Sequence, residues 1–268
     1  MKIKNQNYYG LPENAALLTF DDGYVDHYTN VFPILKNRGI QGSFFVSAKP
    51  LAENKVLDVN KIHYLLATVD SSVLVDNIFL ILNRYRYQGE LIESNEELYN
   101  KFTGKSRFDT QEVIFIKSLL QYGLDAGLRD LVIQELFHKY IDVSEELLSK
   151  EWYLNWEQIC CMKSAGMFFG LHGYEHFWLS EVSNGIMEKD IECALDYFDG
   201  IIDRSCWVMN YPYGSYNNEV ISFIKAQNCK LGLTTEVRVA DISNDDLFEL
   251  PRLDTNDFPP KSKNYKKF

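Results

Sequence analysis

The chain has 268 residues, 46% of them hydrophobic, which is enough for a sizeable core and for one α/β domain. Its formal net charge of −11 argues against the basic surface that nucleic-acid binding requires and against docking on anionic lipid. No apolar run reaches the roughly 18 residues of a membrane span, and five irregularly spaced cysteines predict buried free thiols rather than disulfides.

The N-terminus shows no sign of export. Residues 1–7 are polar and lack the apolar segment typical of a signal peptide. We therefore expect a cytoplasmic protein.

Residues 15–47 are predicted to form a strand, a helix and a second strand. The apolar run 15–18 leads into the turn-like stretch around Gly23, and residues 26–36 carry apolar side chains at helical spacings of three and four. Pro33 weakens the middle of that helix, and Gly39 is suited to end it. Residues 43–46 are a short apolar strand, typical of a parallel sheet that is buried on both faces.

Residues 50 to about 150 have a different texture. Helical patterns cover residues 61–66, 73–85, 111–121 and 127–140, with polar stretches such as 93–97 between them. Only residues 73–75 are an ambiguous strand candidate. We predict a mostly helical insertion or lid within a single catalytic domain spanning residues 1–268.

The alternation of strands and helices resumes after Trp152. Helices are expected at residues 155–163, 187–202 and 219–228, and strands at residues 167–171, 205–209 and 231–234. In a chain of this length, such an alternation favours a barrel or an open parallel sheet.

Asp21 and Asp22 are the first candidate functional residues. Two adjacent carboxylates at the end of a buried strand raise each other's pKa and are costly without compensation. A metal ion would compensate by binding one carboxylate and leaving the other free as a base. Because Asp and Gly are also common turn residues, this stretch alone does not decide between a turn and a site.

His172 and His176 are the second candidate, four residues apart and directly after an apolar strand. A helical turn would place both imidazoles on one face, where they could bind one ion such as zinc. The order differs from that of the HExxH zinc peptidases, because Glu175 is adjacent to the second histidine. A chance pair is the alternative, but with five histidines in the chain this spacing favours metal binding.

The third candidate is the loop Tyr211-Pro212-Tyr213-Gly214, which follows a predicted strand. Proline stiffens such a loop and glycine permits close approach of the backbone, so an N–H group could point at a developing oxyanion. Taken alone, the same residues favour an ordinary turn.

Together these motifs resemble the polysaccharide deacetylase family, the NodB-like carbohydrate esterases. The resemblance covers residues 15–46, 171–176 and 207–217 and leaves out residues 50–150. It implies an α/β fold, a distorted parallel (β/α) barrel that we expect to have seven strands.

The resemblance also implies roles for the residues of the three motifs. Asp22, His172 and His176 would hold a divalent metal, most often zinc in this family. Asp21 would be the general base that deprotonates the attacking water, and the backbone N–H of Tyr213 would help to hold the oxyanion.

The chain departs from the family pattern in two places. Gly173 follows the first histidine, where the family usually has Ser or Thr. No histidine follows His176, although the family's general acid is a histidine near the end of the catalytic domain. His63 is a candidate for that acid if the insertion folds over the site, and an ordinary helix histidine is the alternative. His27 and His138 are interpreted as packing or surface residues.

Arg252 lies in a late segment, residues 251–254, that resembles the place of an arginine paired with the base aspartate. Such a pairing would lower the pKa of Asp21 and keep it ionised. A plain salt bridge is the alternative interpretation.

The resemblance implies a metal-dependent hydrolase that removes an acetyl group from an N-acetylated sugar. A cytoplasmic sugar intermediate or a lipid- or nucleotide-linked glycan precursor is the expected carbohydrate substrate. A catalytically silent, metal-containing carbohydrate-binding protein is the alternative from another class. A third possibility is an enzyme for a different acyl group, a deformylase or an ester hydrolase. The oligomeric state and the choice of sugar are left open.

Overall fold

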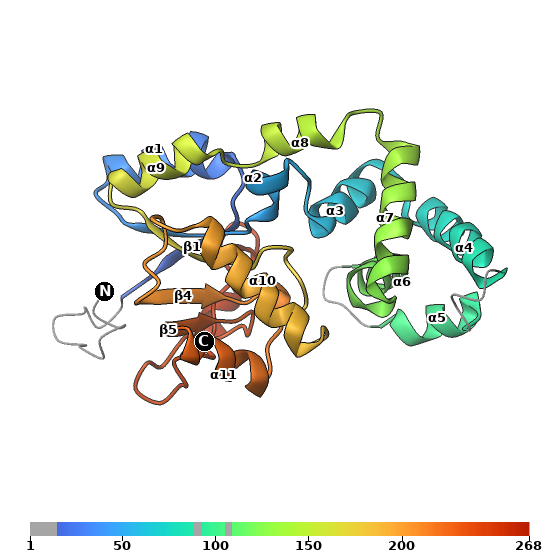
Figure 1. Cartoon of the computed structure of the whole chain (residues 1–268). Helices are drawn as coiled ribbons and strands as arrows, with labels where there is room; N and C mark the ends of the chain where they lie inside the picture. Colours follow the sequence, from blue (N-terminus) through green and yellow to red (C-terminus); the bar gives the residue numbers. More distant parts are fainter. Residues whose placement is uncertain (1–14, 88–92, 105–108, 268) are drawn as a thin grey trace. The chain divides into compact units, whose positions relative to one another are not determined.

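The structure is a computed structural model that describes residues 15–87, 93–104 and 109–267. The chain divides into two compact units (Figure 1). Met1–Lys55 and Ser149–Phe268 form the first unit, which contains the sheet, and Val56–Leu148 form the second, which is helical. Whether the helical unit acts as a lid or insertion within one catalytic domain stays a prediction.

Five strands form one parallel sheet in the first unit, in the order β1-β2-β3-β4-β5. Their bounds are Leu18–Asp22, Gly42–Val46, Phe168–Leu171, Trp207–Asn210 and Cys229–Leu233. Because all five strands are parallel, their carboxyl ends lie at one edge of the sheet, and the loops that follow β1, β3 and β4 meet there. The predicted α/β class is therefore confirmed.

The core of the first unit lies on both faces of the sheet. β2 is buried along its whole length. Phe44 packs into a cluster that includes Phe169, whereas Phe45 packs on the opposite face with Val208 and Leu231. Burial on both faces explains why the strand segments are continuous apolar runs without polar alternation.

The seven-stranded barrel is not confirmed, because the described residues contain five strands in one sheet. Beyond β5, Leu250 makes a single parallel bridge with Leu233. The Arg252 side chain then donates to the Thr234 carbonyl next to β5 and to the Thr19 hydroxyl in β1. In the described part of the chain, a side chain rather than a backbone ladder links the two outer strands.

The helices of the first unit agree with most of the predicted positions. The helix expected at residues 26–36 is a π-helical turn, η2 (His27–Val31), followed by α1 (Phe32–Asn37). Pro33 lies in the first turn of α1, where its missing N–H costs little. The other helices are α2 (Lys49–Glu53), α9 (Trp156–Ser164), α10 (Asn184–Tyr197) and α11 (Asn218–Ala226), with 3-10 turns η4 (Pro212–Gly214), η5 (Thr255–Asp257) and η6 (Asn264–Lys267).

The second unit is helical, as predicted. It contains α3 (Asp58–Thr68), α4 (Ser71–Tyr87), α5 (Asn95–Phe102), α6 (Gln111–Ser118), η3 (Leu119–Gly123) and α7 (Ala126–Tyr140), and α8 (Glu145–Trp152) includes its last residues. Helix α5 was not among the predicted helices, because residues 93–97 are polar. Those residues are the start signal of a helix, since Ser94 and Glu97 form a reciprocal capping box.

Two expectations from composition can be compared with the structure. None of the described helices combines the length and the apolar character that a membrane crossing needs. All five cysteines are free, but only Cys229 is fully buried and Cys161 is exposed. The expectation of buried thiols was therefore right for one residue and wrong for Cys161.

Candidate active site

The end of β1 directs its two carboxylates to different neighbours. Successive residues of a strand point to opposite faces, so Asp21 and Asp22 diverge. Asp22 has a left-handed backbone (φ 70°), and so has Gly23 (φ 81°). A Cβ on Gly23 would lie 2.5 Å from Val46 Cγ1, so only glycine fits this turn.

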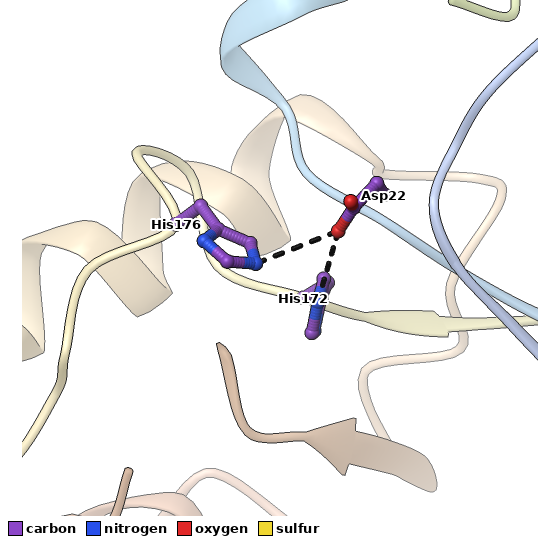
Figure 2. Close-up of side chains that lie close together, drawn as sticks. All are labelled: Asp22, His172 and His176. Carbon is purple, nitrogen blue, oxygen red and sulfur yellow. Dashed lines mark ion pairs between the residues drawn. The ribbon is translucent and has the colours of Figure 1, made fainter. Parts of the chain in front are cut away.

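Asp22, His172 and His176 converge on one point. Asp22 Oδ1 lies 3.3 Å from His172 Nε2 and 3.4 Å from His176 Nε2 (Figure 2). Both histidines are buried. Ligands about 2.0–2.1 Å from a tetrahedral zinc ion lie about 3.3–3.4 Å apart, which matches both distances from Asp22, and the three candidate ligand atoms all lie within 4.8 Å of one another.

The chemistry of the three side chains also fits a cation. His172 Nδ1 lies 2.6 Å from the carbonyl oxygen of Asn210, which fixes this nitrogen as a donor and leaves the Nε2 lone pair for a metal. When both rings are protonated, burial would raise the pKa of Asp22, but the hydrogen bonds and positive charges of His172 and His176 outweigh it and hold that pKa well below its usual range, so that the carboxylate is ionised; a cation would take the place of these Nε2 protons.

The route by which the histidines converge differs from the prediction. Residues 172–176 form a non-helical bend, not a helical turn. Gly173 (φ 73°) and His176 (φ 64°) both have left-handed backbones. The bend folds back on itself and brings the two ring centroids within 4.8 Å.

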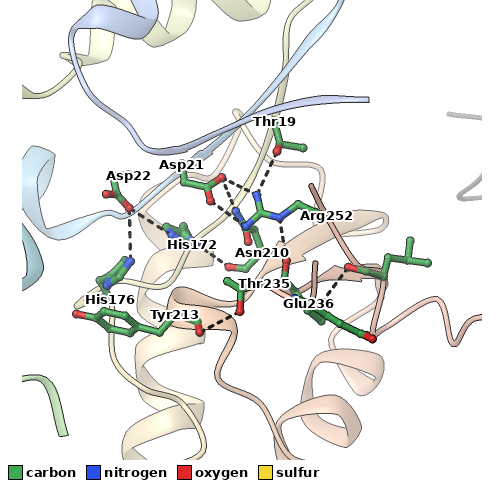
Figure 3. Close-up of polar contacts among 12 residues, drawn as sticks. Thr19, Asp21, Asp22, His172, His176, Asn210, Tyr213, Thr235, Glu236 and Arg252 are labelled. Carbon is green, nitrogen blue, oxygen red and sulfur yellow. Dashed lines mark hydrogen bonds and ion pairs between the residues drawn. The ribbon is translucent and has the colours of Figure 1, made fainter. Parts of the chain in front are cut away.

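Asp21 lies beside this cluster with separate partners (Figure 3). Arg252 binds its carboxylate through two nitrogens, Nη1 at 3.0 Å and Nη2 at 2.9 Å, and Asn210 Nδ2 donates to it at 2.6 Å. Burial would raise the pKa of Asp21, but the charges of His172 and Arg252 and the two sets of hydrogen bonds lower it. Arg252 therefore contacts Asp21 through both carboxylate oxygens, and the catalytic roles of the two residues stay predictions.

Asn210 is a site residue that the sequence analysis missed. It is fully buried at the end of β4. Its carbonyl oxygen faces His172 and its amide donates to Asp21, so one residue contacts both halves of the site. Its position directly before the proline loop was the only available signal.

Tyr213 lies in η4 with a left-handed backbone (φ 58°). Its ring packs edge-on against His176, with centroids 4.5 Å apart, and stacks on Trp178 at 4.8 Å. Its carbonyl accepts from Thr235 Oγ1 at 3.4 Å. The loop therefore lies next to the metal-ligand candidates, and the oxyanion role of the Tyr213 N–H stays a prediction.

The remaining histidines have three different environments. His63 lies on α3 of the helical unit with an exposed side chain, and its role as the general acid stays a prediction. His27 is buried against the rings of Phe20 and Phe44, and burial lowers its pKa to about 4. His138 is exposed on α7. The packing and surface interpretations of His27 and His138 are confirmed.

Asp190 on α10 is a second residue that the sequence analysis missed. Its carboxylate is buried and accepts from the backbone N–H groups of Tyr174 and Glu175, at 2.9 and 2.8 Å. Burial raises its pKa to about 6, against the effect of these two hydrogen bonds. The signal was present: Asp190 precedes Ile191 and shares its apolar helix face with Met187 and Ala194.

Several solved structures resemble this chain in fold. They include IcaB from Ammonifex degensii (18% identity, 96% of this chain and 75% of that one, TM-score 0.51). The BpsB deacetylase domain from Bordetella bronchiseptica has 15% identity over 91% of this chain and 72% of its own, with a TM-score of 0.52. A de-N-acetylase from Aggregatibacter actinomycetemcomitans has 15% identity over 98% and 79%, with a TM-score of 0.53.

The sequence comparisons identify the family. The Bacillus subtilis (strain 168) protein YxkH is 25% identical over 114 residues, which are 35% of this chain and 41% of YxkH. The alignment thus spans less than half of that relative. The sequence profile described as polysaccharide deacetylase matches residues 9–71 and 135–232, more than half of the chain. The chain therefore belongs to the polysaccharide deacetylase family.

Proposed function

We propose that this protein is a zinc-dependent hydrolase that removes an acetyl group from an N-acetylated sugar or glycan precursor. Membership of the family supports deacetylation of a carbohydrate. The observation that carries the proposal is the separation of the two carboxylates at the end of β1. Asp22 lies against two histidine Nε2 atoms, while Asp21 is held apart by Arg252. We also infer that the five-stranded sheet is part of the distorted (β/α) barrel of the family.

The residues can be assigned separate tasks. Asp22, His172 and His176 would hold the ion, which when bound polarises the acyl carbonyl and lowers the pKa of water. Asp21 would take the proton of the attacking water, because Arg252 and Asn210 keep its carboxylate ionised and oriented.

Two further groups complete the proposed reaction. The backbone N–H of Tyr213 would donate to the oxyanion that forms when water adds to the acyl carbon. Collapse of that intermediate breaks the C–N bond, and the leaving amine takes up a proton as acetate is released. His63 is the candidate for delivering that proton.

The test is acetate release by the full chain. The purified protein with added zinc is expected to release acetate from N-acetylglucosamine oligomers, to lose this activity with a chelator, and to regain it with zinc. No release from oligomers, glycan precursors or acetyl esters would reject the proposal. Sugar binding by calorimetry without acetate release would favour the silent carbohydrate-binding protein, which the missing late histidine motivates. Release of formate would indicate a deformylase, and activity on esters alone would indicate an ester hydrolase.

Replacing Arg252 with lysine is expected to lower kcat about 100-fold with zinc affinity unchanged. Lysine keeps the charge but cannot bind both oxygens of Asp21, and small misplacements of a catalytic group cost about this much. Steady-state kinetics and zinc titration provide the measurement. Arg238→Lys is the matched control, because Arg238 binds Glu236 and Asp245 instead. Equal kcat values for Arg252→Lys and the wild type would mean that the contact between Arg252 and Asp21 is a plain salt bridge without a catalytic role.

A further inference from the structure

The bend of residues 172–176 carries both histidines of the candidate metal site. It forms no helix or strand, so its backbone groups need partners from elsewhere. Its carbonyl groups find them in the chain that follows β2. The Ser47 hydroxyl and the N–H groups of the next two residues donate, in order, to the carbonyl oxygens of residues 172–174, at 2.8, 3.2 and 3.1 Å.

Two N–H groups of the bend donate hydrogen bonds to one side chain, that of Asp190 on α10. Oδ2 of Asp190 accepts from the N–H of Tyr174 at 2.9 Å, and Oδ1 accepts from the N–H of Glu175 at 2.8 Å. Asp190 is 4% exposed, so water cannot readily replace it. Both oxygens of this carboxylate therefore serve the two residues between the histidines.

Gly173 and Asp190 fit each other. A Cβ on Gly173 would lie 2.8 Å from Asp190 Oδ2, a contact that real Cβ atoms do not make. With its left-handed backbone, Gly173 also turns the chain so that the next two N–H groups point at the carboxylate. The glycine that departs from the family pattern thus makes room for an acceptor supplied by α10.

We infer that Asp190 is a positioning residue for the metal centre, holding the bend so that His172 and His176 present their Nε2 atoms to one ion. This inference rests on the proposed function. The hydrogen bonds of Asp190 within the described residues go to the backbone N–H groups of Tyr174 and Glu175 and not to either histidine ring, so it acts through the backbone of the bend. Without it, the N–H groups of the half-buried residues Tyr174 and Glu175 lose this acceptor, and the bend loses the constraint that the carboxylate supplies.

The experiment compares the full-length wild type with Asp190→Asn and Asp190→Ala. Asparagine keeps the volume but offers one amide oxygen, so it can accept from one N–H group and its own NH₂ opposes the other. Glu188→Ala is the matched control, because Glu188 is an exposed carboxylate on the same helix. Zinc affinity is measured by competition with a chelating dye, the geometry of the site by the absorption spectrum of the Co²⁺ form, and stability by urea unfolding without metal.

Zinc affinity is expected to fall about 10-fold in Asp190→Asn and up to about 100-fold in Asp190→Ala, the range for residues that orient metal ligands. The Co²⁺ spectra of both Asp190 variants should differ from that of the wild type, whereas the spectrum of Glu188→Ala should match it. A purely structural role would lower stability in urea but leave the affinity and spectrum of the folded protein unchanged, which would overturn the inference.

The remaining outcomes also separate the two claims. If Asp190→Ala does not fold, the asparagine variant decides, and failure of both to fold would overturn the inference by showing that Asp190 serves the fold. If the wild type binds no zinc and releases no acetate, the proposed function fails. If the wild type does both and the variants match it, only the role of Asp190 is rejected.

Discussion

Replacing Asp21 with asparagine is expected to reduce the rate of acetate release by about three to four orders of magnitude, the upper range for loss of a general base. The variant should still bind zinc, because Asp22 and the two histidines are unchanged. Asparagine keeps the shape of the side chain but cannot take up a proton. Single-turnover acetate release and zinc titration measure the two quantities in one preparation.

Asp26→Asn is the control for Asp21→Asn. Asp26 is an exposed carboxylate five residues along the chain, and its side chain accepts from Asn30 at 3.3 Å. Its replacement should leave both turnover and zinc affinity at wild-type levels. If Asp21→Asn retained wild-type turnover, Asp21 would not be the base. If it lost zinc as well as turnover, Asp21 would belong to the metal ligands.

Replacing His176 with glutamine is expected to weaken zinc binding by more than about 100-fold, a greater loss than for residues that only orient ligands. His176 is better suited to this test than His172. Its Nδ1 makes no hydrogen bond with the described residues, whereas that of His172 faces the Asn210 carbonyl. The substitution therefore removes a ligand atom without removing a hydrogen bond of the other ring nitrogen.

His138→Gln provides the comparison for His176→Gln, since His138 is an exposed histidine on α7. It should bind zinc as the wild type does. Zinc content after dialysis and affinity by dye competition are the measurements. Unchanged affinity in His176→Gln would remove His176 from the ligand set and, with it, the tripartite site of Asp22, His172 and His176.

The local elements of the fold were largely predictable because each depends on nearby residues. The apolar runs at β2 and β3 identify strands buried on both faces, and the helical spacing of apolar residues identified α4 and α7. The missed α5 shows the limit of that method. Its evidence lies in a capping box of polar side chains, which a search for apolar periodicity does not detect.

The candidate site was predictable only in part. Asp21, Asp22, His172 and His176 stand out because their residue types and spacing are unusual after apolar strands. Asn210 and Asp190 do not stand out, since a buried polar residue is meaningful only once its partner is known. Each contacts a segment more than ten residues away in sequence, Asn210 reaching Asp21 and Asp190 reaching Tyr174.

By itself, the sequence determined the α/β class, the mostly helical character of residues 50 to about 150, and the candidate residues at the ends of β1, β3 and β4. These features follow from short-range patterns of apolar and polar residues. Tertiary structure decided the number of strands, the bend that replaces the expected helical turn, and the separate partners of Asp21 and Asp22. Such features depend on which distant backbone and side-chain groups satisfy one another once buried, and the spacing of residues along the chain does not record that.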